Sequence, residues 1–181
     1  MNRRRAAGGR LPAPRPAARN RQPDMEGPIT KWSARLVEGH IFEAGPEGRS
    51  HIIDADSKTA PGPVEVLLEA IMTCSGVDVV DILAKRRTPV EKFRIEIAAH
   101  RRVEHPRRVM KLDVDYIIDG AGIDAEQAER AIELAFEKYC TVIGSLGNDI
   151  VSHSRLVLNG QAMERRSRKM FDASVTPRSS A

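Results

Sequence analysis

Two stretches near the middle of the sequence constrain the fold more than any other part of the chain. Apolar residues occupy every second position of residues 93–99 and again of residues 110–118. A period of two is typical of a β-strand that buries one face and exposes the other. A short segment, residues 104–107, which contains a proline, separates the two stretches. The sequence therefore predicts an antiparallel β-hairpin here.

Helical patterns precede and follow this hairpin. In residues 63–87 apolar side chains recur at steps of three and four, the spacing that forms one stripe along an α-helix. A second such pattern begins at Asp124, which with Gln127 has the spacing of a capping box, and continues to Tyr139. Further strands are expected at residues 29–37, with residues 41–42 extending this strand past Gly39, and at residues 51–54 and 150–158. This order predicts an α+β protein whose helices cover antiparallel sheet instead of alternating with parallel strands.

The sequence predicts one folded domain between two basic ends. The chain has 181 residues, enough for a single domain with a sizeable core. Its excess of positive charge lies in the two ends, whereas residues 25–160 are acidic overall, so nucleic acid is not expected to bind the folded domain. We expect residues 1–27 to form a disordered basic arm, residues 28–160 the domain, and residues 161–181 a basic, disordered tail after a short helical extension. Met25 is a second candidate for the start of the chain.

The sequence shows no sign of a membrane or secretory segment. No apolar run approaches the roughly 20 residues that a membrane-spanning helix needs. The arginine-rich start lacks the apolar stretch of a secretory signal. These patterns predict a cytoplasmic protein without a membrane partner, in a compartment that keeps thiols reduced.

The chain has only two cysteines, Cys74 and Cys140, and each lies at the edge of one of the two helical stripes. If the stripes pack against each other, the two thiols come within disulfide reach, which requires Cα atoms less than about 7 Å apart. The pair is then either a redox centre or two small buried hydrophobic residues, since cysteine is among the most buried residue types. The 5 histidines show no metal-ligand spacing with each other or with the cysteines, so no metal site is expected.

Four segments of the sequence resemble one known protein family. Residues 61–68 lead into the first cysteine and are followed by residues 77–83, and residues 137–140 precede a final strand that contains residues 152–154. These motifs and their order resemble the OsmC/Ohr superfamily, specifically its OsmC-like branch, over residues 30–160. The resemblance favours the redox interpretation of the two thiols.

The resemblance implies an OsmC-like fold, with antiparallel sheets packed around two long central helices in an intertwined homodimer. It also implies that the thiols reduce organic hydroperoxides without a cofactor. Cys74 is then the peroxidatic cysteine, which attacks the peroxide, and Cys140 is the resolving cysteine, which closes a disulfide. The implied partners are a second copy of the chain, a small-molecule hydroperoxide, and a small dithiol or a lipoyl-bearing protein as reductant.

The charged residues that assist the thiol in characterised members of the superfamily have no full match in this chain. In those members an arginine favours the thiolate, and a glutamate ten residues before the first cysteine holds that arginine; here the position is Val64. Glu65 is the candidate instead, although it lies about 100° further round the helix and would also serve as a helix-dipole residue. Arg35 and Arg49 are the candidate arginines, with Arg49 preferred because a side chain at a turn can fold over a pocket.

Two alternative functions are predicted. The first is a thiol peroxidase for hydrophobic hydroperoxides that acts in oxidative stress defence, with Met72 and Phe136 among the apolar surroundings of Cys74. The second is a dimeric OsmC-like scaffold, or a protein that binds small hydrophobic molecules, whose turnover was lost with the missing glutamate. Both alternatives retain the fold and both thiols.

The first helix is expected to be buried on more than one side. Val66, Val77 and Val80 lie off its main apolar stripe, and a helix that is apolar on several sides is usually covered on several sides. This pattern predicts a second copy of the chain as the additional partner. Asp78 and Asp81 are assigned to the solvated side of the same helix.

Overall fold

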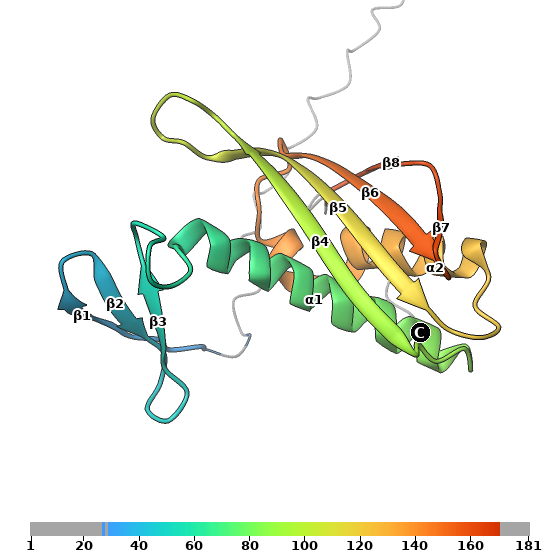
Figure 1. Cartoon of the computed structure of the whole chain (residues 1–181), viewed down its shortest axis with the longest axis horizontal. Helices are drawn as coiled ribbons and strands as arrows, with labels where there is room; N and C mark the ends of the chain where they lie inside the picture. Colours follow the sequence, from blue (N-terminus) through green and yellow to red (C-terminus); the bar gives the residue numbers. More distant parts are fainter. Residues whose placement is uncertain (1–26, 28, 171–181) are drawn as a thin grey trace, which may run out of the picture. The chain divides into compact units, whose positions relative to one another are not determined.

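The computed structural model describes residue 27 and residues 29–170 (Figure 1). The chain divides into two units, Met1–Trp32 and Ser33–Ala181, and every helix and strand lies in the second. Apart from Gly27, the arm predicted for residues 1–27 lies outside the described residues, as does the alternative start at Met25. Among the described residues, no helix is both long enough and apolar enough to cross a membrane.

Helix α1, Pro63–Lys85, is the long helix that the sequence predicted. Its start is fixed by a proline in the first turn and by Glu65, whose carboxylate accepts the Gly62 backbone N–H at 2.6 Å. Its buried residues are Ile71, Ser75, Gly76, Val79 and Leu83, and the four-residue steps from Ile71 through Ser75 and Val79 to Leu83 place them along one face. This face packs into the core, as the apolar stripe indicated.

The main sheet has five strands and includes the predicted hairpin. Strands β4, Lys92–Arg101, and β5, Val109–Asp119, pair antiparallel. Strand β6, Val151–Leu158, lies on the other side of β5 and pairs with it in parallel. The prediction of purely antiparallel sheets is therefore wrong at β6. The connection from β5 to β6 contains the second helical segment and crosses over the sheet, which brings the chain back in the same direction.

The domain extends beyond residue 160, so the predicted boundary there is wrong. Strands β7, Gln161–Ala162, and β8, Arg166–Arg168, both pair antiparallel with β6. Arg168 is buried, and its guanidinium hydrogen-bonds to Glu129 and to the Ser154 hydroxyl. These buried partners order a segment whose basic composition alone predicted a disordered or helical tail. Residues 171–181 lie outside the described residues.

A smaller antiparallel sheet precedes α1. Its strands β1, Ala34–Glu38, β2, Ile41–Ala44, and β3, His51–Asp54, lie in the order β1-β2-β3. The first strand is shorter than the predicted segment 29–37 and begins at Ala34. Strand β3 appears where the sequence placed it. The expectation that residues 41–42 extend the first strand is wrong, because the chain turns at residues 39–40 and these residues belong to β2, which pairs antiparallel with β1.

The second helical segment is broken into three pieces. Helix α2, Ala125–Leu134, is followed by one π-helical turn, η1, Ala135–Tyr139, and after Cys140 by the short helix α3, Thr141–Gly144. The Asp124 carboxylate caps α2, as predicted, by accepting two backbone N–H groups. Only α1 is therefore a long helix, and the expectation of two long central helices is wrong for this chain.

The hydrophobic core lies between one face of the main sheet and the helices. Alternate residues of β5 are fully buried, and at their centre Tyr116 packs edge to face against Phe136 of η1 with ring centroids 6.4 Å apart. The core also includes Ile71 of α1 and Ile132 of α2. It holds α1 and the broken helical segment together, and both cysteines lie where these two elements meet.

Candidate active site

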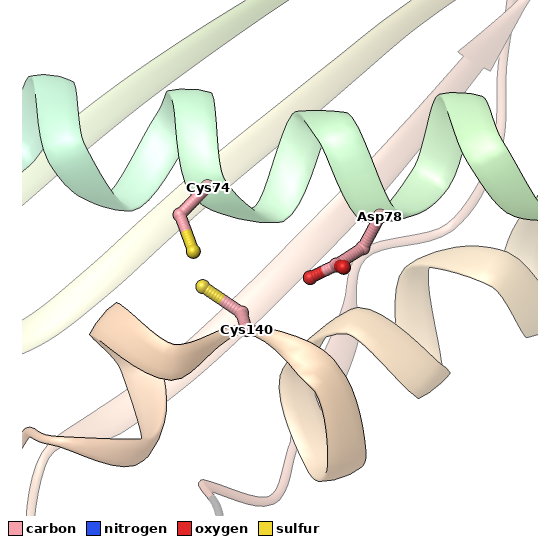
Figure 2. A group of neighbouring side chains, drawn as sticks. All are labelled: Cys74, Asp78 and Cys140. Carbon is pink, nitrogen blue, oxygen red and sulfur yellow. The ribbon is translucent and has the colours of Figure 1, made fainter. Parts of the chain in front are cut away.

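The two thiols meet in the structure together with one carboxylate. Cys74 and Asp78 project from α1, and Cys140 projects from the junction between η1 and α3 (Figure 2). One side-chain ligand atom from each of these residues lies within 4.8 Å of the other two. Both cysteines are free thiols. The expectation that the two helical segments bring the thiols together is confirmed.

The break in the second helical segment presents Cys140 to α1. The backbone of Cys140 is extended, with φ −67° and ψ 106°, directly after the π-helical turn. Its backbone N–H closes that turn by donating to the Ala135 carbonyl at 3.0 Å, and its sulfur accepts the Ile143 N–H at 3.4 Å. These two contacts fix the backbone and the sulfur of Cys140, which points toward Cys74 in Figure 2.

The two thiols differ in exposure, and burial alters the acidity of Cys140. Cys74 is half-buried, whereas Cys140 is only 4% exposed. Burial raises the pKa of the Cys140 thiol to about 12, although the hydrogen bond from Ile143 opposes this change, and the neighbouring Cys74 sulfur adds to it. At neutral pH Cys140 is thus protonated. Of the two cysteines, Cys74 is the more exposed.

Asp78 lies one helical turn after Cys74, on the same side of α1. Its Oδ2 atom is buried and has no hydrogen-bond partner among the described residues. Burial raises the pKa of the Asp78 carboxyl, and the nearby Asp81 raises it further, while Lys85 opposes the change. The assignment of Asp78 to the solvated side of the helix is therefore wrong, whereas Asp81 is exposed as predicted.

The same three side chains do not form a recognisable metal centre. A closed structural zinc site uses four protein ligands, and the common three-ligand catalytic zinc sites each include a histidine. The group of Cys74, Asp78 and Cys140 offers three ligand atoms and no histidine. We therefore interpret it as a pair of thiols with an adjoining carboxyl group.

A buried hydrogen bond supports the helix beside the thiols. Tyr116 of β5 donates its phenolic hydrogen to the Ser75 hydroxyl at 2.8 Å, and both residues are fully buried. Burial strongly raises the pKa of Tyr116, so the phenol stays protonated and keeps donating. Because Ser75 directly follows Cys74, this bond fixes α1 against the sheet at the level of the thiols.

The structure places the other predicted site residues elsewhere within the chain. Glu65 caps the start of α1, nine residues before Cys74, which corresponds to about 13 Å along the helix axis. Hydrogen bonds from the Gly62 N–H and from Ser57 lower the pKa of Glu65 and keep it ionised in this capping role. Its predicted role next to the thiol therefore requires a second copy of the chain.

The two candidate arginines belong to the small sheet. Arg35 of β1 pairs with Glu43 of β2 on the exposed sheet surface. Arg49 lies in the turn between β2 and β3, is exposed, and makes no side-chain hydrogen bond or ion pair with any described residue. Phe136, predicted to lie near Cys74 as an apolar surrounding, is only 1% exposed and packs on Tyr116, so it does not offer a surface to substrate.

Asp78 is the residue at this site that the sequence interpretation missed. A signal was present, because a spacing of four residues places Cys74 and Asp78 next to each other on one helix face. The spacing alone could not tell that this face would meet Cys140. That contact depends on the break in the second helical segment.

Comparison with known proteins identifies the family. The family model described as "OsmC-like protein" matches residues 55–154. Protein YhfA of Escherichia coli strain K12 is 34% identical over 128 residues, which is 68% of this chain and 92% of YhfA. The structure of a hypothetical protein from Aquifex aeolicus VF5 has a TM-score of 0.67 and 24% identity, covering 74% of this chain and 98% of that one. An organic hydroperoxide resistance protein from Legionella pneumophila has a TM-score of 0.52 and 12% identity, covering 73% of this chain and 98% of its own. The chain therefore belongs to the OsmC-like protein family.

Proposed function

We propose that the protein is a thiol peroxidase that reduces organic hydroperoxides with two cysteines. The observation that carries this proposal is the pairing of the more exposed thiol, Cys74, with the buried one, Cys140, whose sulfur lies within 4.8 Å. An isolated exposed thiol that meets a peroxide remains open to overoxidation. A second thiol already in place converts the oxidised sulfur to a disulfide, which a dithiol can reduce.

The reaction would proceed in two steps. The Cys74 thiolate attacks the terminal oxygen of the hydroperoxide, the O–O bond breaks, and the alkoxide leaves and takes a proton to become an alcohol. Cys74 is then a sulfenic acid. The Cys140 sulfur attacks the Cys74 sulfur, the S–O bond breaks, and water leaves. A small dithiol or a lipoyl-bearing protein would reduce the resulting disulfide and complete the cycle.

An organic substrate agrees with the family. Met72, which the sequence placed near Cys74, lies two residues before it on α1 and is therefore turned about 200° away from the thiol. The Legionella pneumophila protein with a similar fold is named for resistance to organic hydroperoxides. We therefore expect alkyl hydroperoxides to react faster than hydrogen peroxide.

A homodimer is part of this proposal. Val77 of α1 is 61% exposed, and large apolar side chains of the small sheet, such as Phe42 and Leu36, are also exposed. A second copy of the chain would cover such surfaces. It is also the means by which Glu65 and Arg49 could reach the thiols, because one chain places Glu65 far along the helix.

The test is a rapid-mixing experiment with stoichiometric oxidant. Reduced protein is mixed with cumene hydroperoxide or with hydrogen peroxide, and free thiols and protein mass are followed in time. Wild type should lose both thiols rapidly and form one disulfide. Cys74→Ser should not react, whereas Cys140→Ser should stop at a sulfenic acid that dimedone traps. Equal thiol loss in wild type and Cys74→Ser would refute the proposal, and no reaction at all would favour a non-catalytic scaffold or binding protein.

A further inference from the structure

The position of Asp78 is not explained by any structural bond. Its buried Oδ2 atom accepts no hydrogen bond from a described residue, although buried polar atoms in folded proteins nearly always have a partner. The same carboxyl group has an oxygen within 4.8 Å of both cysteine sulfurs. Figure 2 shows it beside the gap between the two sulfurs, on the side of the next turn of α1. An ionisable group held in this way, beside two nucleophiles, indicates a chemical role.

The buried thiol presents a chemical problem that Asp78 is placed to solve. Sulfur attacks as a thiolate, and burial raises the pKa of Cys140 to about 12. At neutral pH Cys140 is therefore almost entirely in its protonated form, because the pH lies far below its pKa. The proton of Cys140 must therefore leave during the attack, and a base must stand within reach.

We propose that Asp78 carries the proton in the step that joins the two cysteines. The Asp78 carboxylate takes the proton from the Cys140 sulfur while that sulfur attacks Cys74. The new S–S bond forms, the S–O bond of the Cys74 sulfenic acid breaks, and the protonated Asp78 gives the proton to the departing hydroxide, which leaves as water. The sulfenic sulfur of Cys74 oxidises the Cys140 thiol, so the step needs no further oxidant or reductant, and Asp78 ends in its starting state. This inference rests on the proposed function, for which it names the acid–base residue.

The groups around Asp78 suit such a role. On α1 it faces Cys74, Asp81 and Lys85, and from the other elements Cys140 and the phenol of Tyr116. Its raised pKa moves its proton affinity closer to that of a thiol, which helps a carboxyl group both to accept and to return a proton.

Asp78 also borders a surface hollow. It lines this hollow together with Asp81, Lys85, Arg86 and Tyr139, among others. The hollow lets the protonation of Asp78 respond to the pH of the solution, so the proposed role can be measured in a pH profile.

A disulfide reagent measures the step without any peroxide. One equivalent of dithiobis-nitrobenzoate reacts with the more exposed Cys74 and releases one thionitrobenzoate. Cys140 then attacks the mixed disulfide and releases the second, so the second release reports the attack by Cys140 alone. Cys140→Ser should abolish this second release.

Removing the carboxylate should slow the second release selectively. Asp78→Asn keeps the size of the side chain but accepts no proton, and the second release should be about 10²–10⁴-fold slower, the usual contribution of a general acid or base. The first release should not slow down, because a negative charge next to Cys74 has been removed. Glu69→Gln is the matched control, since Glu69 is an exposed carboxylate of the same helix and is not among the groups that shift the pKa of Asp78. It should keep a rate close to wild type, and Asp78→Glu should recover part of the rate.

The pH profile separates a chemical role from a structural one. In wild type the rate of the second release should rise with pH as Asp78 ionises and then level off well below the pKa of Cys140. In Asp78→Asn it should rise tenfold per pH unit, following the thiolate of Cys140. A wild-type profile that rises without a plateau, or an Asp78→Asn profile identical to wild type, would overturn the inference. The wild-type profile decides the matter even if Asp78→Asn fails to fold.

The outcomes also distinguish this inference from the proposed function. If Asp78 governs the second release but hydroperoxides leave the thiols intact, the peroxidase proposal fails and the role of Asp78 as a base stands. If hydroperoxides oxidise Cys74 and Asp78→Asn closes the disulfide at the wild-type rate, the peroxidase proposal stands and the role of Asp78 is refuted.

Discussion

The two sheets of the molecule differ in how far their apolar side chains are exposed to solvent. In the main sheet, Leu112, Val114 and Tyr116 of β5 are fully buried under the helices of the same chain. In the small sheet, Leu36 is 58% and Phe42 38% exposed. Apolar residues mark the strands in both sheets, but only those of the main sheet are covered within the chain. A strand pattern predicts which side chains share a face and leaves open what covers that face.

The segment that matches the family model contains most of the main sheet and none of the strands of the small sheet. It covers residues 55–154, which include α1, both cysteines and the β5–β6 crossover. The strands of the small sheet precede this range, and β7 and β8 follow it. The candidate active site therefore lies within the matched segment, on the part of the fold that has its own core.

The largest effect on stability is expected in the main sheet, when the buried guanidinium of Arg168 at its edge is removed. Arg168→Ala leaves Glu129 buried without its principal partner, and we expect a loss of about 3–5 kcal/mol in the free energy of unfolding. Arg166→Ala is the matched control on the same strand, since Arg166 is exposed and its Nε lies 3.7 Å from Glu129. Urea denaturation measures both. Equal losses in the two variants would show that β8 is not held by the buried pair.

A smaller and pH-dependent loss is expected at the end of the small sheet. The Asp54 carboxylate accepts backbone N–H groups of Asp56, Lys58 and Thr59, and these bonds lower its pKa to about 2. A lowered pKa means that Asp54 stabilises the fold above the pKa of the unfolded chain, and that this stabilisation is lost as pH falls toward 2.

Asp54→Asn should therefore lower Tm at neutral pH, less than Arg168→Ala does. Its effect should shrink as pH falls from about 4, the ordinary pKa of an aspartate, toward 2. Calorimetry across this pH range measures the difference from wild type. A difference that stays constant down to pH 2 would show that the loop does not depend on the ionised carboxylate.

A still smaller change in the stability of one chain is expected in the exposed strands. Phe42→Ser alters a side chain that its own chain leaves 38% exposed, so chemical unfolding of an isolated chain should change by about 0.5 kcal/mol or less. If a second copy covers this sheet, wild-type Tm should rise with protein concentration, and the rise should be weaker in Phe42→Ser. Ile52→Ser, on the opposite face of the sheet, is the control. Light scattering that shows only monomer in wild type would contradict the proposed dimer.

The smallest effect is expected at the start of the chain. Residues 1–24 contain little apolar surface. A protein that begins at Met25 should have an unchanged Tm and an unchanged mass in light scattering. A loss of several degrees would show that this segment contributes to the folded part.

The main features of the fold could be predicted because they depend on local patterns. The hairpin, α1 and the Asp124 cap each follow from periodicity or from a capping residue. The direction of β6 does not follow from its own residues, because it is set by the crossover that connects it to β5. The sequence also did not predict that residues 161–170 belong to the folded domain. Their position depends on the buried contact of Arg168 with Glu129, which lies 39 residues away in the chain.

The candidate site, too, could be predicted only where it depends on local patterns in the sequence. The meeting of Cys74 and Cys140 could be predicted from two apolar stripes that pack together. The role of Asp78 could not, because the sequence does not show which residues of the second helical segment lie against that face of α1. In the structure Cys140 directly follows a π-helical turn, and no pattern in the sequence marks that turn.

The crossover between β5 and β6 affects when the two thiols can meet during synthesis and folding of the chain. Cys74 precedes the hairpin and Cys140 lies on the crossover, so the two thiols are separated by 66 residues along the chain. Contacts between distant segments form late and slowly, because the chain must first close a long loop. During synthesis the first thiol is therefore made before its partner exists. An internal disulfide in this protein would thus report that the long-range pairing of the chain is complete, and the pair of thiols can serve as a built-in probe of folding.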